Sequence, residues 1–274
     1  QLSSLRSMAW SIILASYVEA AENAGVKSMV TVFQSAPVKQ PLWQTRCLTS
    51  VRHWCSQHGY NYQFLGDELF DRVPETLRSK LAGRTPIIAD LARLSLLKDH
   101  LESTGGTVLW LDADTLIVDA SWVPNTDASV CFGEEYWLDR DRRGRLKAFK
   151  QPHNAFMLFS QGNAVLPFLH QVAYSIIERA DPSAISPQMI GPKLLKALHS
   201  LAQFSLCPQA GALSPSLAHD LVRGSGSTIE AFRVADRPTP CLWNLCGSLA
   251  LENNHEQYLL ELTKAPALFS PLSQ

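Results

Sequence analysis

The chain has 274 residues, of which 46% are hydrophobic and 18% are charged, and its formal net charge is −1. This composition is typical of a globular protein that buries a sizeable core in one large α/β domain or two small ones. The nearly balanced charge gives no global field that would attract nucleic acid or an anionic membrane, so we expect no nucleic-acid partner. The six cysteines include no C-x-x-C pair, which disfavours a zinc site and suits a reducing compartment better than a disulfide scaffold.

The longest apolar stretch, residues 8–18, is too short and too interrupted by serine to span a bilayer. Its apolar residues recur at helical spacing before Gly25, so we expect an N-terminal helix. The alternative is a signal-peptide core behind Arg6, and a leader removed ahead of Gln1 also stays open. We expect a cytoplasmic location and no transmembrane span.

Strand and helix patterns then alternate, which predicts a parallel, doubly wound sheet. The expected elements are strands over residues 29–33, 60–65 and 108–111, a helix from Pro41 to near Gly59, and a helix over residues 87–101 that stops at Gly105. The C-terminal half is less regular. It predicts strands over residues 130–133 and 155–160, and helices over residues 165–177, 190–201 and 249–262. We expect one domain over residues 1–274, with a sheet-forming half at about 28–118 and a loop-rich half at about 119–274.

Two aspartates, Asp112 and Asp114, follow the apolar strand at residues 108–111. Carboxylates are rarely buried without a partner, and residues two apart leave a strand on the same side. The end of such a strand is the sheet edge where α/β proteins bind ligands. Two hard oxygen ligands suit Mg²⁺ or Mn²⁺, which commonly also holds a phosphate. The alternative is an Asx-turn in which both aspartates cap backbone amides.

Further candidates surround this pair in the sequence. Asp90 and Arg93 fall on the apolar face of the helix over residues 87–101, where charged residues are unexpected. They form either an i,i+3 ion pair at the end of a packing face or a polar anchor for a ligand. Asn154 begins an apolar strand and is either a ligand-binding residue or simply a turn residue. Gln188 precedes a helix that starts at Gly191-Pro192 and is either a site residue or a solvated loop residue. His153, His219 and His255 are possible further metal ligands, and the charged segment 140–147 reads as a solvated loop.

These segments resemble the GT-A-fold glycosyltransferases. In that superfamily a nucleotide-binding sheet ends in a DxD motif that holds Mn²⁺ or Mg²⁺ and the diphosphate of a sugar nucleotide, as Asp112-Ala113-Asp114 would here. Residues 89–94 resemble the S-D-x-x-R-Y/L segment of the DXD sugar transferases, where the Asp and Arg contact the donor. Residues 154–158 are similar to the N-A-G-V-M segment of glycogenin-like and lipopolysaccharide galactosyltransferases, and Gln188 and Gly191-Pro192 stand near the place of their D-Q and T-G-P segments. Phe156 departs from the usual Gly, Pro187 from the usual Asp, and no H-x-x-G-x-x-K-P-W segment closes the chain.

The resemblance implies a Rossmann-like GT-A three-layer fold with a mostly parallel sheet and an irregular C-terminal half. It also implies a metal-dependent glycosyltransferase that moves a sugar, with retention, from a UDP- or GDP-sugar to a protein, lipid or glycan acceptor. The site residues expected on this basis are the catalytic Asp112, Asp114 and Gln188, the donor-binding Phe33, Gln34, Asp90, Arg93, Trp110, Asn154 and Gly191, and the metal ligands Asp112, Asp114 and His219.

Two other functions are compatible with the pattern. Asp112-x-Asp114-Thr115 also resembles the first motif of haloacid-dehalogenase-like phosphohydrolases, with Asp112 as nucleophile and Asp114 as general acid/base. Against it, the motif lies in mid-chain, Thr115 stands where Gly is usual, and the remaining acidic metal ligands are missing downstream. The second alternative is a non-catalytic module that binds a sugar nucleotide or carbohydrate.

Overall fold

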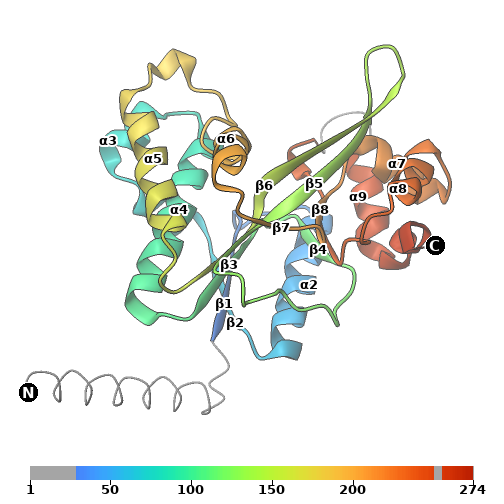
Figure 1. The fold of residues 1–274 in the computed structure, drawn as a ribbon, viewed down its shortest axis with the longest axis horizontal. Coiled ribbons are helices and arrows are strands. Elements are labelled where there is room, and N and C mark those ends of the chain that lie inside the picture. The colour runs from blue at the N-terminus through green and yellow to red at the C-terminus, as the bar shows by residue number, and fades with distance from the viewer. Residues whose placement is uncertain (1–28, 250–254, 274) are drawn as a thin grey trace, which may run out of the picture.

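A computed structural model describes residues 29–249 and 255–273. Its two sheets have the strand orders β2-β1-β3-β6-β5-β7 and β4-β9-β8 (Figure 1). The strands are β1 (Val30–Ser35), β2 (Asn61–Leu65), β3 (Thr107–Leu111), β4 (Thr115–Ile117), β5 (Val130–Arg140), β6 (Leu146–Ser160), β7 (Ser205–Cys207), β8 (Ala210–Ala212) and β9 (Leu242–Asn244). The α-helices are α2 (Leu42–His58), α3 (Glu75–Lys80), α4 (Thr85–Thr104), α5 (Val165–Arg179), α6 (Pro192–Ala202), α7 (Pro215–Arg223), α8 (Ser227–Val234) and α9 (His255–Lys264), and the 3₁₀ helices are η1 (Asp67–Arg72), η2 (Pro182–Ala184), η3 (Gly247–Leu249) and η4 (Pro266–Ser273).

The first half of the chain follows the predicted order of strands and helices. β1 lies between β2 and β3 and pairs in parallel with both. α2 starts after Pro41 and ends at Gly59, whose φ of 69° closes the helix in the left-handed region. The helix expected ahead of Gly25 lies outside the described residues. Within the described ranges, no helix combines the length and apolar content that crossing a bilayer requires.

The three-layer α/β fold is as expected, and its sheet is mixed: β1 pairs in parallel with β2 and β3, and β5 with β7, but β6 runs antiparallel to its neighbours. β6 pairs antiparallel with both β3 and β5. The cause is local: β5 and β6 are joined by a tight turn, and strands joined by so few residues must run antiparallel. The expected strands over residues 130–133 and 155–160 are the inner ends of this long hairpin, and the charged segment 140–147 is its tip.

Helices cover both faces of the main sheet, which gives three layers (Figure 1). Alternate residues of β3 face opposite ways, as a strand requires. Val108 and Trp110 pack toward α4 and α5, whereas Leu109 and Leu111 pack toward α2. A third apolar cluster joins α7, α8, α9 and η4 beside the outer part of the hairpin. The carboxyl ends of β1 and β3 thus lie between the main sheet with its covering helices and the cluster formed by α7, α8, α9 and η4.

Candidate functional site

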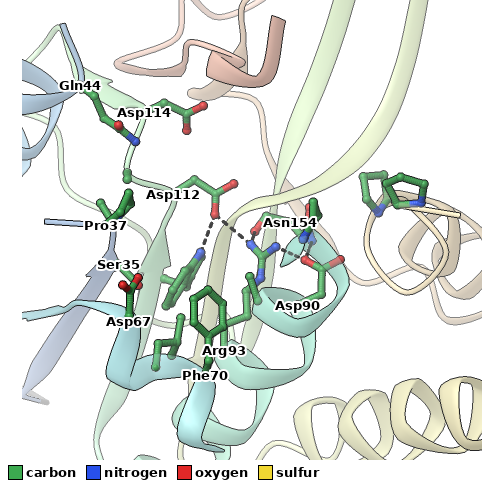
Figure 2. A pocket seen from close by; sticks show the side chains of 18 residues that line it. Ser35, Pro37, Gln44, Asp67, Phe70, Asp90, Arg93, Asp112, Asp114 and Asn154 are labelled. Carbon is green, nitrogen blue, oxygen red and sulfur yellow. Dashed lines mark hydrogen bonds and ion pairs between the residues drawn. The ribbon is translucent and has the colours of Figure 1, made fainter. Parts of the chain in front are cut away.

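Asp112 lies directly after β3, where the backbone turns toward β4. One carboxylate oxygen, Oδ1, accepts a hydrogen bond of 2.6 Å from Trp110 Nε1 and an ion-paired bond of 2.8 Å from Arg93 Nη1 (Figure 2). Trp110 reaches it because residues two apart share one side of a strand. The other oxygen, Oδ2, has no partner among the described residues, so it remains available to a ligand.

Asp90 and Arg93 form a buried ion pair that extends to Asp112. They are 5% and 8% exposed, and Arg93 Nη2 pairs with Asp90 Oδ1. Arg93 Nη1 also donates to the backbone oxygen of Asn154 at 3.1 Å, and Asn154 Nδ2 donates to Asp90 Oδ1 at 3.1 Å. Burial raises the pKa of Asp90, and the guanidinium of Arg93 opposes that shift. The unexpected charges on the apolar helix face are thus both an ion pair and the support of Asp112.

Gly191 brings the start of α6 against this network. A Cβ atom at this position would lie 2.8 Å from Asn154 Nδ2 and 2.9 Å from Asp90 Oδ2. Atoms this close must move apart, so only glycine allows the helix start to approach Asp90 and Asn154. The lack of a side chain at Gly191 therefore lets the start of α6 pack against Asp90 and Asn154.

Asp114 is held by groups from the far end of the chain. Its Oδ1 accepts from Asn244 Nδ2 at 2.6 Å and its Oδ2 accepts from the backbone N–H of Gly247 at 2.7 Å. Among the described residues, no Lys, Arg or His side chain forms an ion pair with it. Burial raises its pKa to about 6, and the neighbouring charge of Asp112 adds to this shift while the two hydrogen bonds oppose it. Asn244 and Gly247 were not among the predicted site residues, and nothing local to them signals this role.

Two cavities meet at the aspartate pair. The first, of about 360 Å³, is lined on its far side by the end of β1 and by η1, through Ser35, Pro37, Asp67 and Phe70 (Figure 2). The second, of about 610 Å³, is lined by residues of the hairpin and by Gln188. Both are lined by Asp112, Asp114, Asn154 and Pro192. The structure thus brings Gln188, Asn154 and the aspartates together, as the sequence predicts.

Besides Gly191, three predicted site residues line neither cavity. Phe33 is 1% exposed and packs edge-on against His100, with 5.0 Å between ring centroids. Gln34 is 0% exposed and donates through Nε2 to the backbone oxygen of Asp112 at 3.0 Å. Neither side chain lines one of these cavities, because β1 continues to Ser35 and the residues at and past its end line the first cavity instead. Gln34 instead supports the backbone turn that presents Asp112.

His219 is the third such residue. It lies on α7, bonds to Asp220 through Nδ1 at 3.2 Å, and lines a separate cavity with Tyr258. The structure does not bring it to Asp112 and Asp114, because it lines neither of the cavities that contain the pair. The buried His153 does line the second cavity, but its Nε2 lies 2.9 Å from the backbone oxygen of Ala210 and burial lowers its pKa.

The charges around the two cavities favour a cation at the aspartate pair. Among the described lining residues, carboxylates outnumber the one guanidinium: Asp67, Asp90, Asp112, Asp114 and Glu135 against Arg93. The described part of the chain contains no group of three or more His, Cys, Asp or Glu that could hold a metal. Mg²⁺ is commonly held by only one or two carboxylates together with phosphate and water. Asp112 and Asp114 fit an ion held in that way.

Comparison with known proteins gives no match to a protein-family model and none to a curated protein. Similar solved structures include a glycosyltransferase involved in the glycosylation of the major capsid of PBCV-1, with a TM-score of 0.48 and 13% sequence identity over 85% of this chain and 99% of that chain. They also include the glycosyltransferase GlyE of Streptococcus pneumoniae TIGR4, with a TM-score of 0.41 and 13% identity over 90% of this chain and 64% of that chain. Likenesses this distant do not define an activity, so the function rests on the site itself.

Proposed function

We propose that this chain is a glycosyltransferase that transfers a sugar from a nucleotide-sugar donor with the help of Mn²⁺ or Mg²⁺. The observation that carries the proposal is the pair Asp112 and Asp114, which stands between two cavities at the end of β3 and is tied through Arg93 to Asp90 and Asn154. Two cavities that share their carboxylates suit a reaction between two substrates. The resemblance of these same segments to DXD sugar transferases supports the assignment.

The donor would occupy the first cavity. A diphosphate is strongly anionic, and the lining there offers only Arg93, which is already paired with Asp90 and Asp112. A cation held by Asp112 and Asp114 would neutralise the charge that develops on the leaving diphosphate. Phe70, Leu69 and Pro37 give the far side of the cavity an apolar surface for the base.

The chain's own residues prepare this site before any ligand binds. Trp110 and Arg93 fix one oxygen of Asp112, which leaves Oδ2 as the oxygen for the cation. Asn244 and Gly247 fix both oxygens of Asp114. Asp90 and Asn154, held by the same network, would accept and donate hydrogen bonds at the sugar hydroxyls. Such pre-organised groups need not reorient during the reaction.

We propose transfer with retention, on the strength of the segments that resemble retaining enzymes. Gln188 lines the second cavity beside the aspartates, where the resemblance places a residue of the D-Q segment. The anomeric configuration of the product, read from its proton coupling constant by NMR, tests this point.

A phosphohydrolase is less well supported. A nucleophilic Asp112 would need one oxygen for attack and the other for Mg²⁺, but Oδ1 is already bound by Trp110 and Arg93. That chemistry also needs further acidic Mg²⁺ ligands, and the described residues offer no third one beside the pair.

Thermal-shift measurements with UDP- and GDP-sugars, with and without Mn²⁺, test the proposal. We expect one donor class to raise the Tm only when Mn²⁺ is present, and we expect this response to be lost in Asp112→Asn and Asp114→Asn. Asp127→Asn is the matched control, because Asp127 is exposed and lines neither cavity. A protein that ignores every donor but hydrolyses p-nitrophenyl phosphate through Asp112 would contradict the proposal.

A further inference from the structure

The outer part of the β5–β6 hairpin has two faces with different surroundings. On one face, Tyr136 packs against Phe232 with 5.9 Å between ring centroids, and Leu138 is buried in the C-terminal helical cluster. Glu134 on the same face pairs with Arg237 and with Lys150, the latter at 2.8 Å. This face therefore packs mainly against the protein's own C-terminal helices.

The opposite face is open to the second cavity. It carries Glu135 and Trp137 from β5 and Phe149 and Gln151 from β6, all of which line that cavity. Trp137 is directly opposite Phe149, and Glu135 is directly opposite Gln151. Side chains on directly opposed residues are neighbours, so the two rings form one aromatic surface next to one polar pair. Phe149 is 54% exposed.

We infer that this face binds the acceptor of the reaction and that the acceptor is a neutral carbohydrate. A pyranose ring has an apolar face of C–H groups and a rim of hydroxyls. The electron-rich faces of Trp137 and Phe149 match the C–H face. The polar pair matches the rim: Gln151 Nε2 donates to Glu135 Oε2 at 3.1 Å, which leaves Glu135 Oε1 and Gln151 Oε1 to accept from hydroxyls.

The charges that line the second cavity favour a neutral acceptor over an anionic one. The described lining of the second cavity includes no Lys or Arg. The nearby lysines are engaged elsewhere, because Lys150 pairs with Glu134 and Lys147 with Asp141. A sugar phosphate, an acidic sugar or a lipid phosphate would therefore meet Glu135 without a compensating cation. A neutral sugar meets no such penalty.

The aromatic surface of Trp137 and Phe149, here called the carbohydrate platform, lies where an acceptor would bind. Its cavity joins the donor cavity at Asp112, Asp114 and Asn154, so a sugar that rests on Trp137 and Phe149 can extend a hydroxyl toward the aspartate pair. The acceptor role rests on the proposed function. Carbohydrate binding by itself does not, and can be measured without a donor.

Binding to an array of immobilised neutral oligosaccharides, acidic oligosaccharides, serine- and threonine-containing peptides and phospholipids tests the inference. We expect the unmodified protein to bind neutral oligosaccharides, with affinity weakened roughly tenfold in Trp137→Ala and in Phe149→Ala. Phe168→Ala is the matched control, because Phe168 is 55% exposed on α5, away from both cavities, and this variant should bind like the unmodified protein. Circular dichroism confirms that each variant is folded.

The outcomes separate the two proposals. Failure of every nucleotide sugar to shift the Tm contradicts the proposed transferase. The array then still decides whether the platform binds neutral carbohydrate. A donor response together with binding only to peptides or only to phospholipids overturns the carbohydrate platform and keeps the transferase. Neutral-oligosaccharide binding that Trp137→Ala and Phe149→Ala leave intact also overturns it, because the sugar then binds elsewhere.

Discussion

Asp112 and Asp114 stand two residues apart but have different electrostatic surroundings. Asp112 bonds to the Arg93 guanidinium, whereas Asp114 is held by the neutral donors Asn244 and Gly247. The pKa of Asp114 is accordingly raised to about 6 by burial and by the charge of Asp112. Groups whose environments are this distinct commonly have different roles. Here Arg93 keeps Asp112 in place, whereas we expect Asp114, which has no cationic side chain bonded to it among the described residues, to be stabilised by an added cation.

The raised pKa of Asp114 predicts that the contribution of this residue to the stability of the cation-free protein decreases as the pH rises through about 6. An unfolded aspartate has a pKa of about 3.9, whereas that of folded Asp114 is about 6. Between these values the folded state binds more protons than the unfolded state, so the free energy of unfolding falls with rising pH. This contribution is fully present below the unfolded pKa and is lost as the pH passes through about 6.

Urea unfolding in EDTA at several pH values, for the unmodified protein and for Asp114→Asn, measures this contribution. The hydrogen bond lost in Asp114→Asn lowers the free energy of unfolding by an amount that does not depend on pH. Any pH dependence of the difference in free energy between the two proteins therefore reports the titration of Asp114. We expect the stability of the unmodified protein relative to the variant to decrease toward neutral pH. A difference that does not vary with pH would mean that Asp114 titrates normally. Asp127→Asn should show no such trend.

At the level of elements, the site depends on close approach between α4, β6 and the start of α6. We expect Gly191→Ala to destabilise the fold by about 1–3 kcal/mol, as overpacking of a tight contact does. The added Cβ would push Asp90 and Asn154 apart, so we also expect a weaker donor-induced Tm shift. Gly66→Ala is the control, because its Cβ would meet only the flexible side chain of Glu68. Equal effects of the two substitutions in urea unfolding would refute the close-approach argument.

The parts of the fold that could be predicted from sequence are those with a strong local period. α2, α4 and the first three strands have clear apolar patterns and helix-ending glycines, and they occur where expected. The outer arms of β5 and β6 were missed because one of their faces is polar and open, so residues 134–140 and 146–152 have no continuous apolar run.

The site was predictable only where charge contradicts a local pattern. Asp90 and Arg93 stood out because they interrupt an apolar face, and they do support Asp112. Asn244 supports Asp114 across 130 positions of sequence, and no local pattern reports such a contact. Trp137 was missed for a similar reason, because the sequence alone does not predict whether an aromatic residue in a half-polar strand is buried in the core or exposed on the surface.

At the scale of the whole molecule, the two halves of the chain share the site. β4 follows the aspartate turn directly and pairs with β9, where Thr115 is opposite Asn244. The β5–β6 hairpin contributes Phe132 to the core below α4 and α5 and Leu138 to the C-terminal cluster. The hydrogen bonds from Asn244 and Gly247 to Asp114 therefore depend on both cores.

This sharing predicts that the described halves unfold together and that damage to the distant core weakens the site. Phe269 in η4 is buried against Trp243 of β9, with 5.5 Å between ring centroids, and Trp243 adjoins the Asn244 that holds Asp114. We expect Phe269→Ala to lower the free energy of unfolding by about 3–5 kcal/mol, as removal of a buried phenyl ring does. Circular dichroism and tryptophan fluorescence should still report one coincident transition, because neither core keeps its full set of contacts alone. The exposed Phe168→Ala should have little effect. Two separate transitions, of which Phe269→Ala shifts only one, would instead show that the aspartate site can persist while the C-terminal cluster unfolds.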